Sequence, residues 1–398
     1  MRIGLFTDFY MPHQGGVETA VLTHAQALRS HGHDVTVVCP KYKGAKQSEP
    51  GILRLETLKS WHPHMHPTVT VSGRNKAAVS ALKLDIVHMH TDLGVGHLAT
   101  WYAHKYGTPL IQTIHTNDVS WAKHNYKRPL RYLLSGVGRT QSLWQSKRTG
   151  THRSHRLAGQ TSYLYERWLL KKIFSSSHHA KAIIVPSLHF MEELKQYYPE
   201  GNYAVVPNAI DLTTITPRFE DPTLPVRILW IGRVSAEKRP LVFMEVIKRL
   251  SQSTDRAFLV DIIGNGPELT AVKAFARRHN LDNVRIHGGL PYDKVKLFWE
   301  LTDVFVLTSH NFDTQAIVLV EAAASGAMAV LSDKNLASLI APQGHVLANG
   351  PDPASVAEAL SKTLIKKTPK SAQPIRAYAE KTYSLEVLAQ NLENIYKN

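Results

Sequence analysis

Short apolar runs of strand length alternate with amphipathic segments along the chain. The first helical segment, residues 15–32, repeats apolar side chains at a spacing of three and four and ends at Gly32. Strands that alternate with helices predict parallel sheets that helices cover on both faces. The expected strands form two series, 2–7, 35–39, 85–90, 109–115 and 180–187, then 227–233, 258–264, 284–289, 304–309 and 327–333.

Residues 208–225, between the two series, are rich in Pro, Thr and Asp and predict a linker. A chain of 398 residues is long enough for two domains of ordinary size. We therefore expect an α/β protein with two doubly wound Rossmann-like domains, 1–206 and 207–375, and a last segment, 376–398, whose amphipathic helix could pack back on the first domain. Ligands bind beyond the carboxyl ends of parallel strands, so the active site is expected in a cleft that the domains face.

Charge and cysteine content narrow the possible partners. The net charge is +15. The segment from Trp121 to Lys172 is rich in lysine and arginine and contains a single acidic residue, Glu166. Such a cluster suits an anionic membrane surface or nucleic acid, or it is a solvated basic loop. No aromatic–basic recognition module accompanies it, so we expect no specific nucleic-acid partner. The single cysteine, Cys39, excludes an internal disulfide framework and fits a reducing cytoplasm.

Two cations and two carboxylates follow expected strands of the second series. Arg233 and Lys238 come directly after one strand, and Asp313 and Glu321 after another, on either side of an apolar run that should open a helix. The cations can neutralise a diphosphate, and the acids can accept hydrogen bonds from ribose and sugar hydroxyls. The alternatives are solvated surface cations and acids that cap a helix or form salt bridges. Together the four residues predict a cradle for a sugar nucleotide.

The apolar run after Asp313 should begin its helix at Gln315. The first turn would then contain Ala316, Ile317 and Val318, whose free N–H groups can face a diphosphate. Glu321 lies inside this apolar run, where a carboxylate is costly to bury unless it is hydrogen-bonded. We expect it to need a partner, for which a ribose diol is suitable.

Two glycine pairs follow strands and suit a close approach to phosphate. Gly15 and Gly16 open the first helix, although a tight turn without a ligand would explain them equally well. Gly264 and Gly266 lack the third glycine of the dinucleotide-binding fingerprint. A loop that faces the nucleotide in a transferase explains this pair better than a dehydrogenase does.

Histidines at strand ends are further candidates. His115 ends an expected strand and could project toward sugar or acceptor, with Asp118 three residues later to orient it; a structural role is the alternative. His88 and His90 are expected to point to opposite faces of their strand, where they could not chelate one ion together. We therefore expect no metal site.

These segments together resemble glycosyltransferase family 4, whose members are retaining enzymes of the GT-B fold. The resemblance runs in family order across nearly the whole chain. It is carried by GGVET, DIVHMH, TIHT, VPNAID, GRVSAEK, IIGNGPE, VRIHGGL and the helix that contains Asp313 and Glu321.

The resemblance implies a role for each donor-side residue. Arg233 and Lys238 would hold the diphosphate of a UDP- or GDP-sugar, and Glu321 would bind the ribose. Asp313 would contact the sugar hydroxyls, and Gly16 would approach the phosphates. The loop of Gly264 and the helix start at 316–318 belong to the same donor site.

It also implies a mechanism without metal or cofactor, in which cations and a helix dipole stabilise the leaving diphosphate. His115 would lie beside the transferred sugar. The acceptor hydroxyl would attack from the face that the diphosphate leaves, and a phosphate oxygen would take its proton.

Two departures qualify the resemblance. The family usually has Glu where this chain has Asp313, and the segments after the helix, SGAMAVL and DKNLASLIAPQG, lack the usual proline, glycines and acid. These changes motivate an alternative, a catalytically silent binding or partner protein.

Family members that resemble this chain glycosylate diacylglycerol or phosphatidylinositol. The resemblance therefore implies a lipid or glycan acceptor and a cytoplasmic protein, peripheral on the inner face of the cell membrane. Residues 162–174 mix aromatic, aliphatic and basic side chains as an interfacial helix would, although a helix that covers the sheet is the simpler reading. The oligomeric state is not predicted.

Overall fold

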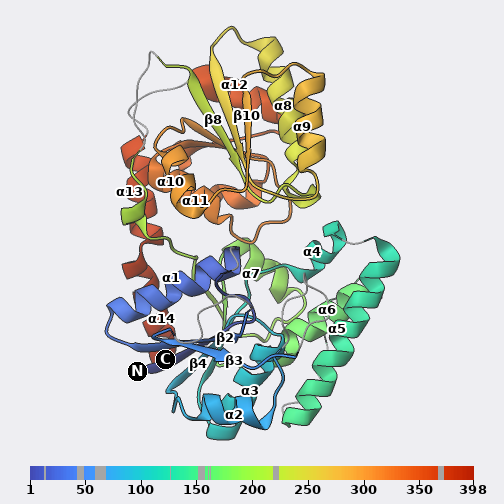
Figure 1. The fold of residues 1–398 in the computed structure, drawn as a ribbon, viewed down its shortest axis with the longest axis vertical. Helices are drawn as coiled ribbons and strands as arrows, with labels where there is room; N and C mark the ends of the chain where they lie inside the picture. The colour runs from blue at the N-terminus through green and yellow to red at the C-terminus, as the bar shows by residue number, and fades with distance from the viewer. Residues whose placement is uncertain are drawn as a thin grey trace. The chain divides into compact units, whose positions relative to one another are not determined.

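Two compact units make up the protein, as seen in a computed structural model (Figure 1). The structure describes residues 1–12, 15–42, 49–58, 69–125, 127–150, 157–159, 161, 163–217, 224–365 and 372–398. Unit 1 consists of Met1–Ala209 with Leu385–Asn398, and unit 2 of Ile210–Ser384. Relative to the expected boundaries, 207–209 belong to unit 1 and 376–384 to unit 2. Residues 218–223 of the expected linker lie outside the described residues.

Unit 1 is built on a parallel sheet with the strand order β3-β2-β1-β4-β5-β6-β7. The order reverses between β1 and β4, which makes their carboxyl ends the switch point of this sheet. The strands β3 and β7 were not expected from the sequence. The strands are β1 (Arg2–Phe6), β2 (Asp34–Pro40), β3 (Ile52–Leu55), β4 (Ile86–Met89), β5 (Leu110–Thr113), β6 (Ala182–Val185) and β7 (Tyr203–Val205).

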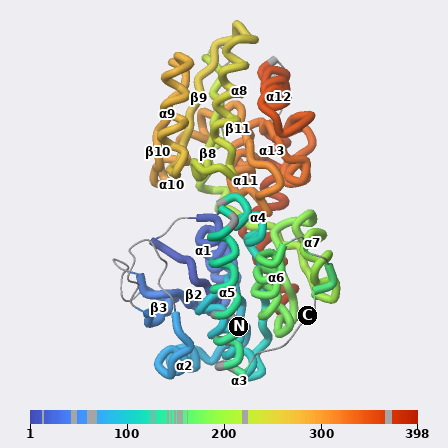
Figure 2. Tube along the Cα trace, turned by 90° about the vertical axis from the view of Figure 1, so that its right-hand side faces the viewer, coloured from blue at the N-terminus to red at the C-terminus, as the bar shows by residue number. Residues whose placement is uncertain are grey.

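Helices cover both faces of this sheet because its strands are apolar on both. Ile3 and Leu5 of β1 pack with α1 and α14 on one face, and Phe6 packs with α3 on the other. The helices α5 and α6 run side by side (Figure 2). The helices are α1 (Gly16–Ser30), α2 (Gly73–Ser80), α3 (Gly94–Tyr106), α4 (Asp118–Asn125), α5 (Arg128–Thr149), α6 (Leu164–Ser177), α7 (Leu188–Lys195) and α14 (Leu385–Lys397).

Unit 2 repeats the design with a parallel sheet in the order β10-β9-β8-β11-β12-β13. Its switch point lies between β8 and β11. The expected second series of strands is present, and β13 adds an edge strand. The strands are β8 (Val226–Ile231), β9 (Phe258–Ile263), β10 (Val284–Gly288), β11 (Val304–Leu307), β12 (Met328–Leu331) and β13 (His345–Leu347).

Two apolar clusters fill the space on either side of this second sheet. One is formed with α8, α9 and α12, and the other with α10, α11 and α13 (Figure 1). The helices are α8 (Pro240–Ser253), α9 (Leu269–Arg278), α10 (Tyr292–Trp299), α11 (Ile317–Ser325), α12 (Pro353–Ile365) and α13 (Ala372–Tyr383), with short 3₁₀ helices η1 (Leu212–Thr214), η2 (Ala236–Lys238), η3 (Lys334–Leu339) and η4 (Pro342–Gly344).

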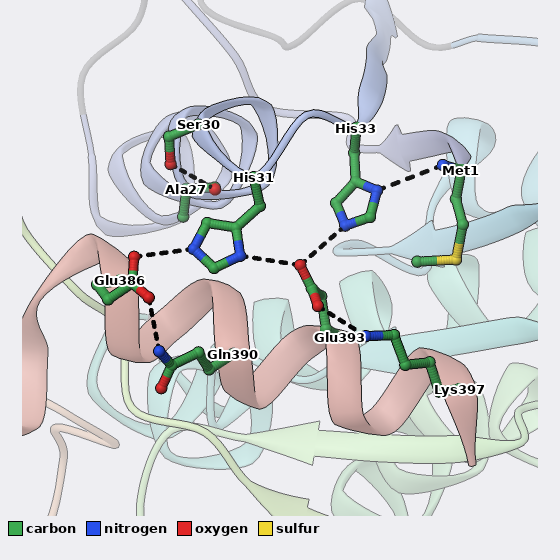
Figure 3. A network of polar contacts seen from close by, with 9 residues as sticks. All are labelled: Met1, Ala27, Ser30, His31, His33, Glu386, Gln390, Glu393 and Lys397. Carbon is green, nitrogen blue, oxygen red and sulfur yellow. Dashed lines mark hydrogen bonds and ion pairs between the residues drawn. The ribbon is translucent and has the colours of Figure 1, made fainter.

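The last helix, α14, returns to unit 1 and packs against α1. Its residues Leu388 and Leu392 are buried in the core that α1 shares with the sheet. At the rim, a polar network closes over this contact (Figure 3). The His31 ring contacts Glu386 and Glu393, each at 2.9 Å, and the His33 ring contacts Glu393 at 3.1 Å. We call these side chains the His–Glu latch.

Two glycines let the loop after β9 lie directly on the loop after β8. Gly264 has a φ of +145°, and a Cβ atom there would lie 1.8 Å from the Gly232 carbonyl oxygen. A Cβ atom at Gly266 would lie 2.2 Å from the Val234 carbonyl oxygen. Both glycines are therefore explained by the approach of two backbone segments. By contrast, a Cβ atom at Gly16 would meet nothing within 4 Å.

We expect the latch to stabilise the protein most in a limited range of pH. The hydrogen bonds to Glu386 and Glu393 raise the pKa of His31 above 6.5, so its contribution is complete below pH 6.5 and is lost as the pH rises through the raised value. Lys397, His31 and His33 lower the pKa of Glu393 from 4.5 to about 2, so its contribution is complete above pH 4.5 and is lost toward pH 2. Glu393→Gln should therefore lower the melting temperature most between pH 4.5 and 6.5.

The control for this experiment is Glu380→Gln, which removes an exposed carboxylate paired with Arg376 on one helix. Since arginine does not titrate in this range, the effect of the control should stay constant from about pH 5 to 8. A loss of melting temperature in Glu393→Gln that is equally constant over that range would contradict the latch.

Gly264→Ala should lower the free energy of unfolding by about 2 kcal/mol or more, because its methyl group has no space and its backbone conformation is unfavourable for alanine. Gly16→Ala is the matched control and should change stability by less than about 1 kcal/mol. Chemical denaturation measures both. Equal effects of the two substitutions would refute the close backbone approach.

Candidate functional site

The switch point of unit 2 brings the two predicted cations and Asp313 to one edge of the sheet. The strands β8 and β11 are adjacent and parallel, so the loops that leave their carboxyl ends emerge together. The first loop carries Arg233 and η2, which ends at Lys238, and the second carries Asp313. Thr308 joins the two loops: its hydroxyl accepts a hydrogen bond from Trp230 at 2.9 Å and donates one to the Lys238 carbonyl at 2.8 Å.

Lys238 and Asp313 form an ion pair at this edge. The Lys238 ammonium contacts one oxygen of Asp313, and the Ser309 hydroxyl donates to the other. The lysine side chain is 20 % exposed and the aspartate 9 %. Both oxygens of Asp313 are thus engaged, whereas an ammonium has three N–H donors and can also bind a further anion.

The guanidinium of Arg233 is exposed to solvent. Within the described part of the chain it has no ion pair or hydrogen bond. Its backbone is well fixed, because Val234 N–H donates to the Asn265 carbonyl at 2.9 Å and Glu268 N–H donates to the Val234 carbonyl at 3.0 Å. The loop that contains Gly264 and Gly266 therefore fixes the backbone next to Arg233 through these two hydrogen bonds.

Glu321 lies inside the unit, and its partners come from α10. It is buried at 4 % exposure, and the Trp299 indole N–H donates to its Oε2 at 3.2 Å. Tyr292 also hydrogen-bonds to it. Burial raises the pKa of Glu321 to about 7, although both hydrogen bonds act in the opposite direction. The expected need for a partner is met by these two aromatic residues, which the sequence analysis did not identify. Ribose binding by Glu321 stays a prediction.

The helix α11 begins at Ile317, two residues later than expected. Gln315 precedes it, and Ala316 is its N-cap, with extended backbone and no side-chain cap. Leu319 N–H donates to the Ala316 carbonyl at 2.9 Å. The sequence predicted a first turn that starts at Gln315, but the helix places only Ile317 and Val318 there. The first turn of this helix carries no acidic side chain, and the partial positive charge of a helix N-terminus favours an anion.

In unit 1, Gly15 is the N-cap of α1 and Gly16 its first residue. Gly15 has a φ of −168°, an extended conformation open to any residue, and both glycines are exposed. Neither glycine is therefore required by a left-handed turn. Contact of Gly16 with phosphate stays a prediction.

His115 follows β5 and contacts a second histidine. Its Nε2 lies 2.9 Å from Nδ1 of His90, and burial lowers its pKa to about 4. Asp118, expected to orient His115, has a different partner: it forms a salt bridge with the buried Lys172 at 3.2 Å. Lys172 also pairs with Asp92 at 3.2 Å. The sequence had placed Lys172 in a basic patch, whereas it lies inside unit 1.

The prediction that His88 and His90 point to opposite faces of β4 is wrong. Their ring centroids are 4.3 Å apart, and the His24 ring from α1 lies 5.0 Å from His90. Side chains two residues apart on a strand share a face, and only successive side chains alternate. The geometric argument against a shared metal ion therefore does not hold.

The exposed apolar surface of unit 1 lies on α5 more than on the segment predicted from the sequence. In the predicted segment, of which residue 162 lies outside the described residues, Leu170 and Phe174 are buried, as in a helix that covers the sheet. On α5, Leu133 is 62 % exposed and Val137 53 %. A groove of about 840 Å³ between α5 and α6 is lined by these and by Arg139, Thr140, Leu143, Leu164, Arg167, Trp168 and Lys171, among others. Every helix in the described part of the chain is too short or too polar to cross a membrane.

Comparison with known proteins places this geometry among glycosyltransferases. An alpha-monoglucosyldiacylglycerol synthase from Acholeplasma laidlawii is 24 % identical over 423 positions, which cover 100 % of this chain and 96 % of the relative. A protein of the same name from Streptococcus pneumoniae is 25 % identical and covers 82 % of this chain and 70 % of the relative. A phosphatidyl-myo-inositol mannosyltransferase from Mycobacterium leprae is 22 % identical, covering 100 % and 96 %.

Solved structures confirm the fold class. A sucrose-phosphate synthase from Thermosynechococcus elongatus matches with a TM-score of 0.70 at 16 % identity, covering 99 % of this chain and 98 % of that structure. The Anabaena protein HepE, solved in complex with UDP and glucose, matches with a TM-score of 0.68 at 15 % identity over 100 % of both chains. The two Rossmann-like units are therefore those of the GT-B fold.

Two family models divide the chain between them. The model of Glycosyltransferase Family 4 matches residues 14–214, just over half of the 398 residues, and the model of Glycosyl transferases group 1 matches residues 215–382. The resemblance expected from the motifs is confirmed, and the chain belongs to glycosyltransferase family 4.

Proposed function

We propose that the protein is a retaining, metal-independent hexosyltransferase that moves a sugar from UDP or GDP to a membrane lipid or a lipid-linked acceptor. The observation that carries the proposal is the edge of unit 2, where one loop carries the Lys238 ammonium and the exposed Arg233 guanidinium, which has no partner among the described residues. The uncapped N-terminus of α11 follows the neighbouring strand. These groups are the kind that hold a nucleoside diphosphate.

Each group has a distinct part in the proposed reaction. Arg233 and Lys238 neutralise the charge that grows on the diphosphate as its bond to the anomeric carbon breaks, which is the function that a metal ion has in other transferases. Asp313, fixed by Lys238 and Ser309, accepts hydrogen bonds from sugar hydroxyls. The loop that contains Gly264 and Gly266 fixes the backbone next to Arg233 by hydrogen bonds to Val234.

Retention of configuration follows from attack on the face that the diphosphate leaves. The acceptor oxygen forms a bond to the anomeric carbon, the bond from that carbon to the diphosphate breaks, and the hydroxyl proton passes to a phosphate oxygen. In this scheme no protein carboxylate is needed as a nucleophile. Gly16 and His115 belong to the switch-point region of unit 1. In this scheme the backbone of Gly16 approaches the phosphates, and His115 lies beside the transferred sugar.

The lipid acceptor is supported by the relatives, which are named for transfer to diacylglycerol and phosphatidylinositol. It is also supported by the groove between α5 and α6, where exposed aliphatic side chains adjoin Arg139, Arg167 and Lys171. Apolar side chains flanked by cations suit the boundary between headgroups and acyl chains of an anionic membrane. We therefore propose a peripheral protein on the cytoplasmic face of the cell membrane.

A catalytically silent binding protein is the second candidate. It is favoured by the closed surroundings of both acids: Asp313 is engaged by Lys238 and Ser309, and Glu321 by Trp299 and Tyr292. Such a protein would bind the nucleotide without transferring sugar. Formation of a glycolipid from a labelled donor in the presence of lipid vesicles distinguishes the two candidates.

The donor site is tested by a thermal-shift screen of UDP-, GDP- and ADP-sugars. A donor present at a hundred times its dissociation constant should stabilise the protein by about 2.7 kcal/mol. Arg233→Ala removes a charge-assisted phosphate contact and should weaken binding about 10- to 100-fold. Glu321→Gln should weaken it about tenfold if the carboxylate binds ribose.

The control for the screen is Arg249→Ala, which removes an exposed guanidinium paired with Glu245 on α8, away from the site. This variant should bind the donor as the wild type does. The assignment of the site is overturned when Arg233→Ala and Glu321→Gln both keep the full shift.

Membrane association is tested by flotation with vesicles that contain an anionic phospholipid. Replacing both Leu133 and Val137 by Ser removes two exposed aliphatic groups from α5 and should lower vesicle binding about tenfold. Leu297→Ser is the control, since Leu297 is 57 % exposed on α10. High salt should weaken binding of the wild type. Binding that is insensitive to salt and to the double substitution would argue against this surface.

A further inference from the structure

Three histidines meet inside unit 1, at a place that the proposed transfer reaction does not explain. His24 comes from α1, His88 from β4, and His90 directly follows β4. All three are at most 3 % exposed. Their ring centroids are 5.6, 5.0 and 4.3 Å apart, and one ring nitrogen of each lies within 4.8 Å of the others. We call these residues the histidine cluster.

Hydrogen bonding inside the cluster is incomplete. Both ring nitrogens of His24 are buried without a hydrogen-bond partner, and so is Nε2 of His90, among the residues that the structure describes. A buried polar atom without a partner costs about 1–3 kcal/mol, and folded proteins rarely leave one unsatisfied. Because the two nitrogens of one imidazole point in different directions, one nitrogen of His24 and Nε2 of His90 can face the same ligand.

Three imidazole rings that meet at one place, with ring nitrogens that lack a hydrogen-bond partner among the described residues, offer electron pairs that a cation can use. Burial lowers the pKa of His24 and of His90 well below 6.5, and the neighbouring histidines lower both further. The rings are therefore neutral at pH 7, and each has one nitrogen with a free electron pair. Neutral imidazole is the form that binds transition metals.

The remaining nitrogens have partners of the kind that orient metal ligands. Nδ1 of His90 lies 2.9 Å from Nε2 of His115. His88 lies between two hydroxyls, with Nδ1 2.7 Å from Tyr396 Oη and Nε2 2.7 Å from Thr113 Oγ1. A ligating histidine usually holds its second nitrogen in such a bond. His88 has to exchange one of its two hydroxyl partners for the metal.

We propose that His24, His88 and His90 form a binding site for a divalent transition-metal ion of the zinc class. Three imidazoles without a carboxylate are suited to zinc, copper or nickel and unsuited to magnesium or calcium. In a tetrahedral zinc site the nitrogens lie about 3.3 Å apart, so the three rings have to move closer when the ion binds. The ion would join α1 to β4 and fix the surroundings of His115. This role is structural and independent of the sugar-transfer chemistry.

The test measures metal content and metal spectroscopy of the full chain without a histidine tag. The protein is stripped with a chelator, loaded with Zn²⁺ or Co²⁺ and dialysed. The wild type should retain about one ion per chain, and the Co²⁺ form should show the strong visible absorption of four-coordinate cobalt. His24→Leu should lose both signals. It should still fold, because leucine has a similar volume and removes two unsatisfied nitrogens.

Two further variants separate the site from surface binding, since the chain has 22 histidines. His104→Leu removes an exposed histidine and should leave both signals unchanged. His24→Cys supplies a thiolate and should keep the ion, with a new sulfur-to-cobalt absorption. Far-ultraviolet circular dichroism confirms that each variant is folded. The proposal is overturned if the wild type retains no ion, or if folded His24→Leu retains as much as the wild type; a buried water would then be the occupant.

Discussion

The parallel pairing of β8 with β11 is the constraint on which the candidate donor site depends. Val304 is in register with Ile228, and Phe305 with Leu229. This register places the ends of both strands together and lets Thr308 join the two loops that follow them. A shift by one residue would exchange the side chains that pack into the two apolar clusters on either side of the sheet and would move Lys238 relative to Asp313. Packing of the core therefore fixes the distance between the cation and the acid.

The four predicted charges are in three different electrostatic states. Arg233 is exposed and has no partner in the part of the chain that the structure describes, whereas Lys238 and Asp313 neutralise each other at the edge of the sheet. Glu321 is buried, and burial raises its pKa to about 7. Arg233, which has no ion-pair partner among the described residues, can therefore attract an anion to this edge without breaking the pair of Lys238 and Asp313.

Much of the fold could be predicted from the sequence because alternating apolar strands and helices carry a local signal. The short edge strands β3, β7 and β13 were missed, since they are only partly buried and lack the continuous apolar run of the central strands. The carboxylate at Glu321 was recognised as needing a partner, but Trp299 and Tyr292 lie more than twenty residues earlier and only tertiary packing brings them close. For the same reason Lys172 was placed in a surface patch, although its partner Asp118 is on another helix.

The error at His88 and His90 has a different origin. The periodicity of a strand places residues two apart on one face, so the sequence held the information and the inference from it was wrong. The part played by His24 could not have been found in this way, because α1 is separated from β4 by more than fifty residues and two strands. Clusters built from distant elements are visible only once the topology is known.

The order of the units along the chain has a consequence for how the protein is made. Unit 2 is an insertion in unit 1, since the chain leaves unit 1 after Ala209 and returns to it at Leu385. The two ends of the insertion are joined by a hydrogen bond, which the Ile210 N–H donates to the Tyr383 carbonyl at 3.2 Å. During synthesis the apolar face of α1 emerges early but meets Leu388 and Leu392 only once α14 has left the ribosome. The first unit to be translated is thus completed after the second, and the face of its sheet that α1 and α14 share stays incompletely covered while unit 2 is made.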